Sequence, residues 1–125
     1  MAKKNENYSL YGVIGNPLRH TLSPAMQNAA LSKLNIPGLY MAIQLPKKSL
    51  KQFFETLDQF SVRGINVTVP YKEAVIPFLS ELDETAKKIG AVNTIQRKGR
   101  RFRGYNTDVR NWPKPSSALF NVMTI

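Results

Sequence analysis

The amino-acid sequence predicts an α/β fold, built as one mostly parallel mixed sheet with helices on both faces and a C-terminal β-hairpin. Segments with the two-residue period of strands alternate with segments of helical period between residues 8 and 108. This alternating order favours parallel strands that are covered by helices on both faces. A chain of 125 residues with 42% apolar content is long enough to bury one core. We therefore expect a single domain.

The first half of the chain predicts two strand–helix units. Residues 8–14 have a strand pattern and lead through a loop to a helix that Ser23 caps and Pro24 begins. Residues 39–45 predict the second strand, and Ser49 is expected to cap the next helix. The first helix is expected to bury Met26, Ala29, Ala30 and Leu34, and the second Leu50, Phe53, Phe54, Leu57 and Phe60.

The second half predicts a strand, two helices and a hairpin. Residues 64–69 alternate as a strand does, and Pro70 suits the first turn of a short helix over residues 70–76. Pro77 should end that helix before another, marked by Leu79, Leu82, Ala86 and Ile89. The hairpin is predicted from residues 93–97 and 101–105, which flank Lys98-Gly99-Arg100.

Composition excludes several classes of site. The chain has no cysteine and one histidine, which argues against disulfides, thiolate chemistry and a zinc centre. No apolar run approaches the roughly 18 residues of a membrane span. These features predict a soluble, cytoplasmic protein without a membrane partner.

The net charge of +10 raises the question of nucleic-acid binding. The densest basic run, residues 97–103, falls on the predicted hairpin, where a solvated turn is the simpler interpretation. No recognised nucleic-acid motif accompanies the charge, so we rank nucleic-acid binding well below the alternative of a solvated face.

Lys72 and Asp108 form the first candidate site. In the predicted helix over residues 70–76, Lys72 would face the positive end of the helix dipole, which does not help stability. The same field would favour the neutral amine, which suits a residue that gives and takes protons. A carboxylate such as Asp108 is its natural partner, although a solvated surface lysine is the simpler interpretation of Lys72 taken alone.

Four motifs follow one another along the chain. They are Gly15-Asn16-Pro17 with His20-Thr21-Leu22-Ser23-Pro24, Asn66-Val67-Thr68-Val69-Pro70-Tyr71-Lys72, Gly90-Ala91-Val92-Asn93-Thr94, and Asn106-Thr107-Asp108. In this order and spacing they resemble the substrate domain of shikimate dehydrogenase over residues 8–108. The resemblance implies a single substrate-binding domain of an NADP-dependent oxidoreductase that reduces 3-dehydroshikimate to shikimate in aromatic amino-acid biosynthesis.

The resemblance also implies a role for each matching residue. Lys72 and Asp108 would be the catalytic pair that exchanges a proton with the substrate oxygen. The substrate-binding residues implied in this way are Thr21, Ser23, Thr68, Lys72, Asn93 and Asp108. Thr21 and Ser23 would hold the substrate carboxylate, which agrees with the affinity of helix N-termini for anions. Ser23 as a helix cap alone, and Asn93 and Asn106 as turn or strand-end asparagines, remain alternatives.

The sequence departs from the family after its last motif. Val109 stands where relatives commonly have glycine, and residues 109–125 are unassigned. The sequence also lacks the G-x-G-x-x-G turn that holds a dinucleotide, so we expect no NADP site in this chain, although the full-length family uses NADP. The expectation is a truncated domain, inactive alone, with a homo-oligomer through the surface left by the missing domain as a further expectation. The alternatives are a non-catalytic shikimate- or quinate-binding module and one half of a two-chain enzyme.

Overall fold

A computed structural model describes residues 9–18 and 23–108, apart from the side chains of Ser23 and Asp58. Its centre is a six-stranded sheet with the order β2-β1-β3-β5-β6-β4. Strand β1 pairs in parallel with β2 and β3, and β4 pairs in parallel with β6. Strand β5 is antiparallel to both β3 and β6. The sheet is therefore mixed: among the described residues, three of its five strand pairings are parallel, and the two antiparallel pairings are both made by β5.

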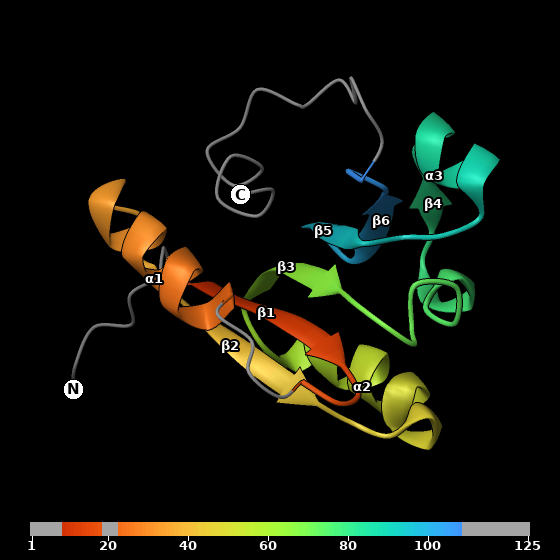
Figure 1. Ribbon diagram of the computed structural model, residues 1–125, viewed down its shortest axis with the longest axis horizontal. Coiled ribbons are helices and arrows are strands. Elements are labelled where there is room, and N and C mark those ends of the chain that lie inside the picture. The colour runs from red at the N-terminus through yellow and green to blue at the C-terminus, as the bar shows by residue number, and fades with distance from the viewer. Residues whose placement is uncertain (1–8, 19–22, 109–125) are drawn as a thin grey trace.

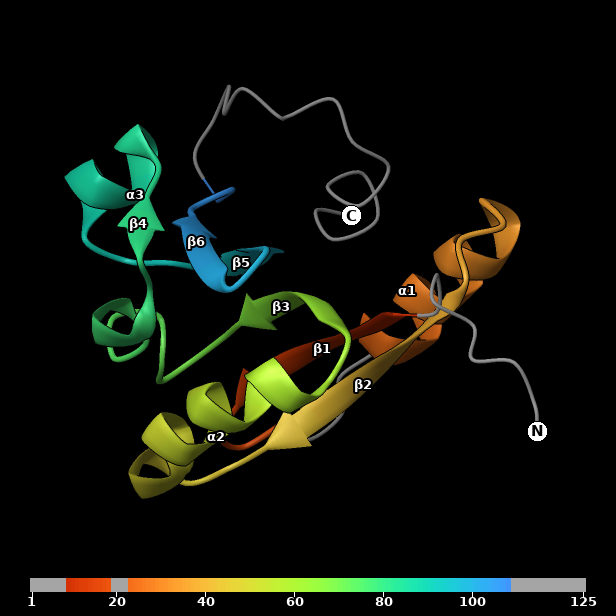
Figure 2. The same ribbon diagram turned by 180° about the vertical axis from the view of Figure 1, so that it is seen from behind.

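The described elements follow the predicted alternation as far as β3 and differ from it between β3 and α3. The strands are β1 (Ser9–Gly15), β2 (Gly38–Gln44), β3 (Val62–Val67), β4 (Glu81–Leu82), β5 (Thr94–Lys98) and β6 (Arg101–Tyr105). The α-helices are α1 (Ser23–Lys33), α2 (Leu50–Thr56) and α3 (Glu84–Ile89), and short 3-10 helices cover Lys47–Ser49, Leu57–Gln59 and Ile76–Phe78. Figures 1 and 2 show α1 beside β1 and β2, and α3 beside β4 at the other end of the sheet.

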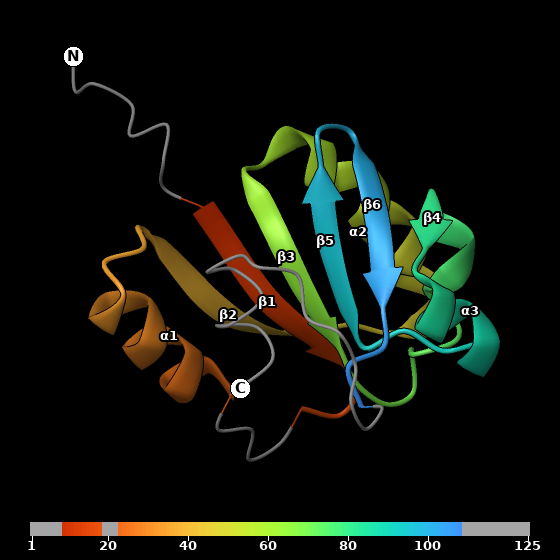
Figure 3. The same ribbon diagram turned by 90° about the horizontal axis from the view of Figure 1, so that it is seen from above.

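Helices α1 and α2 cover opposite faces of the sheet, as Figure 3 shows from above. On the α1 face, Leu31 packs with Tyr11, Val13 and Tyr40. On the α2 face, Ile14 belongs to the larger core cluster. Successive side chains of β1 thus pack into two different cores, because side chains along a strand alternate between the two faces of the sheet. The α2-face core contains Ile14, Leu45, Leu50, Phe54, Leu57, Val62, Ile65, Val67, Tyr71, Val75, Ala86, Val92, Ile95 and Phe102.

The predicted hairpin is confirmed. Lys98 pairs with Arg101, and Gly99 between them has a φ of 63°, in the left-handed region that favours glycine. The short strand β4 pairs with β6, so β4 rather than the hairpin forms this edge of the sheet.

The predicted buried face of α1 is wrong except at Ala30, which packs against the cluster that contains Leu31. Met26 and Leu34 are 51% and 50% exposed, and Gln27 and Leu31 are buried instead. The reason is a long-range contact. The amide of Asn28 donates to the carbonyl of Tyr40 at 3.0 Å, and its oxygen accepts from the Tyr40 N–H at 2.8 Å, which turns this side of α1 toward β2.

Two further helix predictions are corrected. Phe60 is 53% exposed because the chain has already become extended there, with φ −127° and ψ 155°. The helix expected from Leu79 begins later, at Glu84. Asp83 caps it by accepting from the Ala86 N–H at 2.8 Å, while residues 81–82 pair as a strand.

The short helix predicted over residues 70–76 does not form. One turn, closed by the hydrogen bond from Val75 N to the carbonyl of Tyr71, leads into the 3-10 helix Ile76–Phe78. Pro77 has no N–H to donate to the carbonyl of Glu73, which instead accepts from Ile76 N at 3.1 Å, so the turn continues as a 3-10 helix rather than as an α-helix. No described helix is long and apolar enough to cross a membrane.

Candidate active site

The candidate site lies where neighbouring parallel strands β1 and β3 end. From β1 the chain runs through α1, on one face of the sheet, to β2. From β2 it runs through α2, on the other face, to β3. Connections that leave in opposite directions open a crevice at the carboxyl ends of such strands, the usual ligand position in α/β sheets. Gly15 allows the end of β1 to lie close to Thr68, because a Cβ at position 15 would be only 2.5 Å from Thr68 Cγ2.

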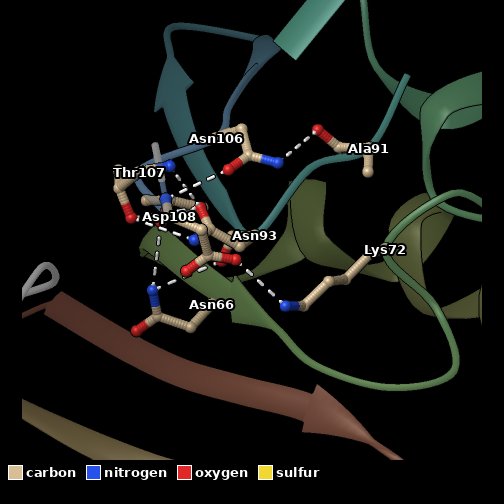
Figure 4. Close-up of polar contacts among 8 residues, drawn as sticks. Asn66, Lys72, Ala91, Asn93, Asn106, Thr107 and Asp108 are labelled. Carbon is tan, nitrogen blue, oxygen red and sulfur yellow. Dashed lines mark hydrogen bonds and ion pairs between the residues drawn. The ribbon is translucent and has the colours of Figure 1, made fainter. Parts of the chain in front are cut away.

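Lys72 and Asp108 meet at this edge of the sheet. Lys72 Nζ lies 3.1 Å from Asp108 Oδ2, and the two side chains are 35% and 60% exposed (Figure 4). An ion pair this exposed contributes little to stability, so its groups are available to a ligand at small cost. Because no α-helix forms over residues 70–76, the helix-dipole argument for Lys72 does not hold. The lysine stands in a turn.

The turn that carries Lys72 is anchored on both sides. Its backbone carbonyl accepts from Val92 N at 2.7 Å, and the hydroxyl of buried Tyr71 donates to the carbonyl of Leu45 at 2.7 Å. An open depression of about 350 Å³ lies beside the turn and is lined by Val69, Pro70, Lys72 and Glu73. The backbone of Lys72 is thus held while its side chain stays accessible.

Asn93 is the centre of a polar cluster next to the ion pair. Its amide nitrogen donates to the Thr107 hydroxyl at 3.0 Å, and its amide oxygen accepts from Thr107 N at 3.0 Å. The Thr94 hydroxyl also donates to that oxygen, at 3.0 Å. These groups form a preorganised set of donors and acceptors, which recognition of a hydroxylated ligand requires.

The structure adds residues that sequence analysis did not single out. Asn66 donates to the Thr94 hydroxyl at 3.3 Å, and its amide oxygen accepts from the Tyr40 hydroxyl at 2.7 Å. Burial raises the pKa of Tyr40, so its phenol remains a donor. A polar Asn66 within an apolar strand was the available signal, and Thr107 lies between two residues that were named.

The remaining predicted residues divide into two groups. Thr68 is half-buried at the end of β3, and its backbone N–H donates to the carbonyl of Ile14 at 3.0 Å. Thr21 and the side chain of Ser23 lie outside the described residues. Helix α1 begins at Ser23, at the edge of the sheet where β1 ends (Figure 3).

Neither a metal centre nor a dinucleotide turn is found in the described part of the chain. Residues 9–18 and 23–108 contain no group of three histidine, cysteine, aspartate or glutamate side chains that could hold a metal ion. The turn after β1 and the turn after β3 lack the G-x-G-x-x-G spacing. The residues at these turns therefore do not fit the pyrophosphate of NADP.

Comparison with known proteins gives a consistent result. A family model described as the shikimate dehydrogenase substrate binding domain matches residues 13–95. The shikimate dehydrogenase (NADP(+)) of Carboxydothermus hydrogenoformans is 52% identical over 104 residues, which are 83% of this chain and 37% of that protein.

Solved structures agree. The crystal structure of shikimate dehydrogenase from Aquifex aeolicus matches with a TM-score of 0.79 and 45% identity, covering 85% of this chain and 40% of that one. Shikimate 5-dehydrogenase from Thermus thermophilus in complex with shikimate matches with a TM-score of 0.75 and 38% identity, covering 80% and 38% of the two chains.

The chain spans little more than a third of the length of these relatives, and the match falls on their substrate-binding part. The fold, the order of the motifs and the matched family model agree with one another. The chain belongs to the shikimate dehydrogenase substrate-binding domain family.

Proposed function

We propose that this chain is the substrate-binding part of an NADP-dependent shikimate dehydrogenase, and that it binds shikimate and 3-dehydroshikimate at the ends of β1 and β3. The observation that carries the proposal is the 3.1 Å contact between Lys72 and Asp108, exposed beside a cluster of hydrogen-bonding groups. Residues 36 positions apart meet there although the contact adds little stability. A role in ligand chemistry accounts for that arrangement.

Each group would serve a different part of the substrate. Thr68 and Asn93 would hydrogen-bond the ring hydroxyls, since a buried polar group left unmatched costs about 1–3 kcal/mol. Thr21 and Ser23 would hold the carboxylate at the start of α1, where backbone N–H groups and the helix dipole favour an anion.

Lys72 and Asp108 would perform the proton transfer. When the ketone is reduced, its oxygen takes a proton from the Lys72 ammonium, and in the reverse direction the amine accepts the proton of the hydroxyl. The Asp108 carboxylate would accept a hydrogen bond from Nζ and so direct the lysine toward the substrate. The relatives are named for NADP(+) as the redox partner. Because the residues at the described turns do not fit that cofactor, only the proton transfer is assigned here.

A titration with shikimate tests this proposal. We expect saturable changes in the NMR spectrum of the ¹⁵N-labelled chain at millimolar shikimate, centred on Thr68, Lys72, Asn93 and Asp108. Affinity should be low, because one domain supplies only part of an enclosed pocket. Lys72→Ala and Asp108→Ala should each weaken binding by about tenfold or more, the value of one hydrogen bond to a charged group.

A matched control comes from another exposed ion pair between a lysine and a carboxylate. Lys51 lies 3.9 Å from Glu55 on α2, and Lys51→Ala should leave shikimate affinity unchanged. Absence of saturable shifts, or affinity that survives both Lys72→Ala and Asp108→Ala, would contradict the proposal. A parallel titration with quinate identifies the preferred ligand. A cytoplasmic location and formation of a homo-oligomer stay predictions.

A further inference from the structure

Asn106 is the last buried residue before the chain becomes exposed at Asp108. It follows β6 directly and is 4% exposed, whereas the side chain of Asp108, two residues later, is 60% exposed. Its amide nitrogen donates to the carbonyl of Ala91 at 3.1 Å, and its amide oxygen accepts from Asp108 N at 3.0 Å (Figure 4). Both functional groups of one buried side chain are therefore bonded to main chain, one of them at the acidic member of the ion pair.

The segment over residues 91–93 holds both members of the ion pair. On the lysine side, Val92 N donates to the carbonyl of Lys72 at 2.7 Å. On the acid side, Ala91 binds the Asn106 amide, which in turn holds the Asp108 N–H. The backbones of Lys72 and Asp108 are therefore both hydrogen-bonded to the same short segment, Lys72 directly and Asp108 through the side chain of Asn106.

We propose that Asn106 is a positioning residue for the Lys72–Asp108 pair, which it serves by holding the main chain at Asp108. The inference rests on the proposed function and extends it to a residue outside the predicted binding set. Without the Asn106 amide, the exposed end of this segment would lose its tie to residue 91, and the carboxylate would spread over more positions. Rates and affinities that depend on a fixed carboxylate are sensitive to displacements of about 1 Å.

A purely structural strand-end asparagine is the competing interpretation. Both interpretations expect Asn106→Ala to lower stability, so a melting curve does not separate them. They differ in coupling, because a positioning residue acts on the ligand only through Asp108. Its effect on affinity must therefore disappear when the Asp108 carboxylate is absent.

The test is a double-mutant cycle on shikimate affinity, measured by NMR titration with Asn106→Ala, Asp108→Ala and the double variant of this chain. Spectra of the free proteins verify that each variant is folded at the chosen temperature. We expect Asn106→Ala to weaken binding about fivefold or more in the wild-type background, and less than about twofold in the Asp108→Ala background. An equal effect in both backgrounds, or no effect in either, would overturn the inference.

Asn28 provides the matched control. Its amide also bonds main chain twice, at Tyr40 N and Tyr40 O, but it ties α1 to β2. Whatever Asn28→Ala does to affinity, it should do equally with and without the Asp108 carboxylate.

A second measurement needs no ligand. Hydrogen exchange at the Asp108 amide should accelerate about tenfold or more in Asn106→Ala, since its acceptor is removed, and Asn28→Ala should not reproduce this. Unchanged exchange would overturn the inference without touching the proposed function. Failure of the wild-type chain to bind shikimate would overturn both, whereas wild-type binding with an uncoupled Asn106 would overturn the positioning role alone.

Discussion

Arg97 Nη1 donates to the carbonyl oxygen of Phe60 at 2.8 Å, which ties the hairpin to the segment that follows α2. The same nitrogen donates to the carbonyl of Leu57 at 2.9 Å, and Nε donates to the carbonyl of Gly99 at 2.9 Å. The guanidinium also lies 5.8 Å from the ring centroid of Phe102. One residue of the basic run is therefore structural.

Replacement of Arg97 should destabilise the fold. Hydrogen bonds from charged donors contribute about 1.5–3 kcal/mol in favourable cases, and these are partly exposed, so we expect Arg97→Ala to cost about 1–2 kcal/mol. Arg100→Ala, at the exposed turn of the hairpin, is the control and should stay within about 0.5 kcal/mol of wild type. Urea unfolding measures both. Equal unfolding midpoints for the two variants would show that the carbonyl contacts contribute nothing.

Gln27 offers a stabilising substitution. It is 5% exposed, and within the described part of the chain its Oε1 has no hydrogen-bond partner. A buried unpaired acceptor costs about 1–3 kcal/mol, so Gln27→Met, which keeps the length of the side chain, should raise the free energy of unfolding by about 1 kcal/mol. The exposed Gln52→Met is the control and should change little. A less stable Gln27→Met protein would mean that this oxygen is satisfied in solution.

Stability should fall at alkaline pH, in part through Tyr40. Burial raises the pKa of Tyr40 above its ordinary value of 10.0. The unfolded chain therefore releases this proton near pH 10 while the folded chain retains it. Above that pH, the free energy of unfolding should fall by up to about 1.4 kcal/mol per pH unit on account of this group.

Tyr40→Phe isolates that contribution. At pH 7 it removes the hydrogen bond to Asn66 and should cost about 1 kcal/mol. Between pH 10 and 11 the variant should lose stability less steeply than wild type, although Tyr11 and Tyr105, whose pKa values burial also raises, remain. Parallel stability curves for the two proteins over this range would refute the assignment.

Local patterns were sufficient for most of the elements, although not for β4 or for the chain between β3 and β4. The hairpin followed from two alternating segments around a glycine turn, and Gly99 adopts the expected positive φ. The face of α1 did not follow, because an alanine-rich helix has apolar residues on several sides. The pairing of Asn28 with Tyr40, which decides that face, joins residues 12 apart in the sequence.

The site shows the same division. Lys72 and Asp108 could be named from motifs, but the expected helix at Lys72 was wrong, because its backbone is fixed by Val92 rather than by a helix. The position of Asn106 within a known motif gave no hint of its bond to Ala91, 15 residues earlier. Contacts of this kind depend on how β3, β5 and β6 pack together, and the local hydrophobic pattern of the sequence does not contain that information.

A polypeptide of these 125 residues should show no NADP-dependent oxidation of shikimate. It spans 37% of a relative named shikimate dehydrogenase (NADP(+)), and the matched part is the substrate-binding domain. A steady-state assay of NADPH formation with millimolar shikimate measures this. Turnover by the 125-residue chain alone would contradict the expectation that NADP binds outside these residues.

The most direct test of the central claim is the activity of Lys72→Ala in a chimera that joins this domain to the nucleotide-binding part of a relative. If Lys72 transfers the proton, Lys72→Ala should lower kcat by about 10²-fold or more, the usual contribution of a general acid–base group. Its melting temperature should hardly change, because the Lys72–Asp108 pair is exposed. A chimera that keeps its activity with alanine at position 72, or one that loses activity and melting temperature together, would contradict the assignment of Lys72 as the proton-transfer residue.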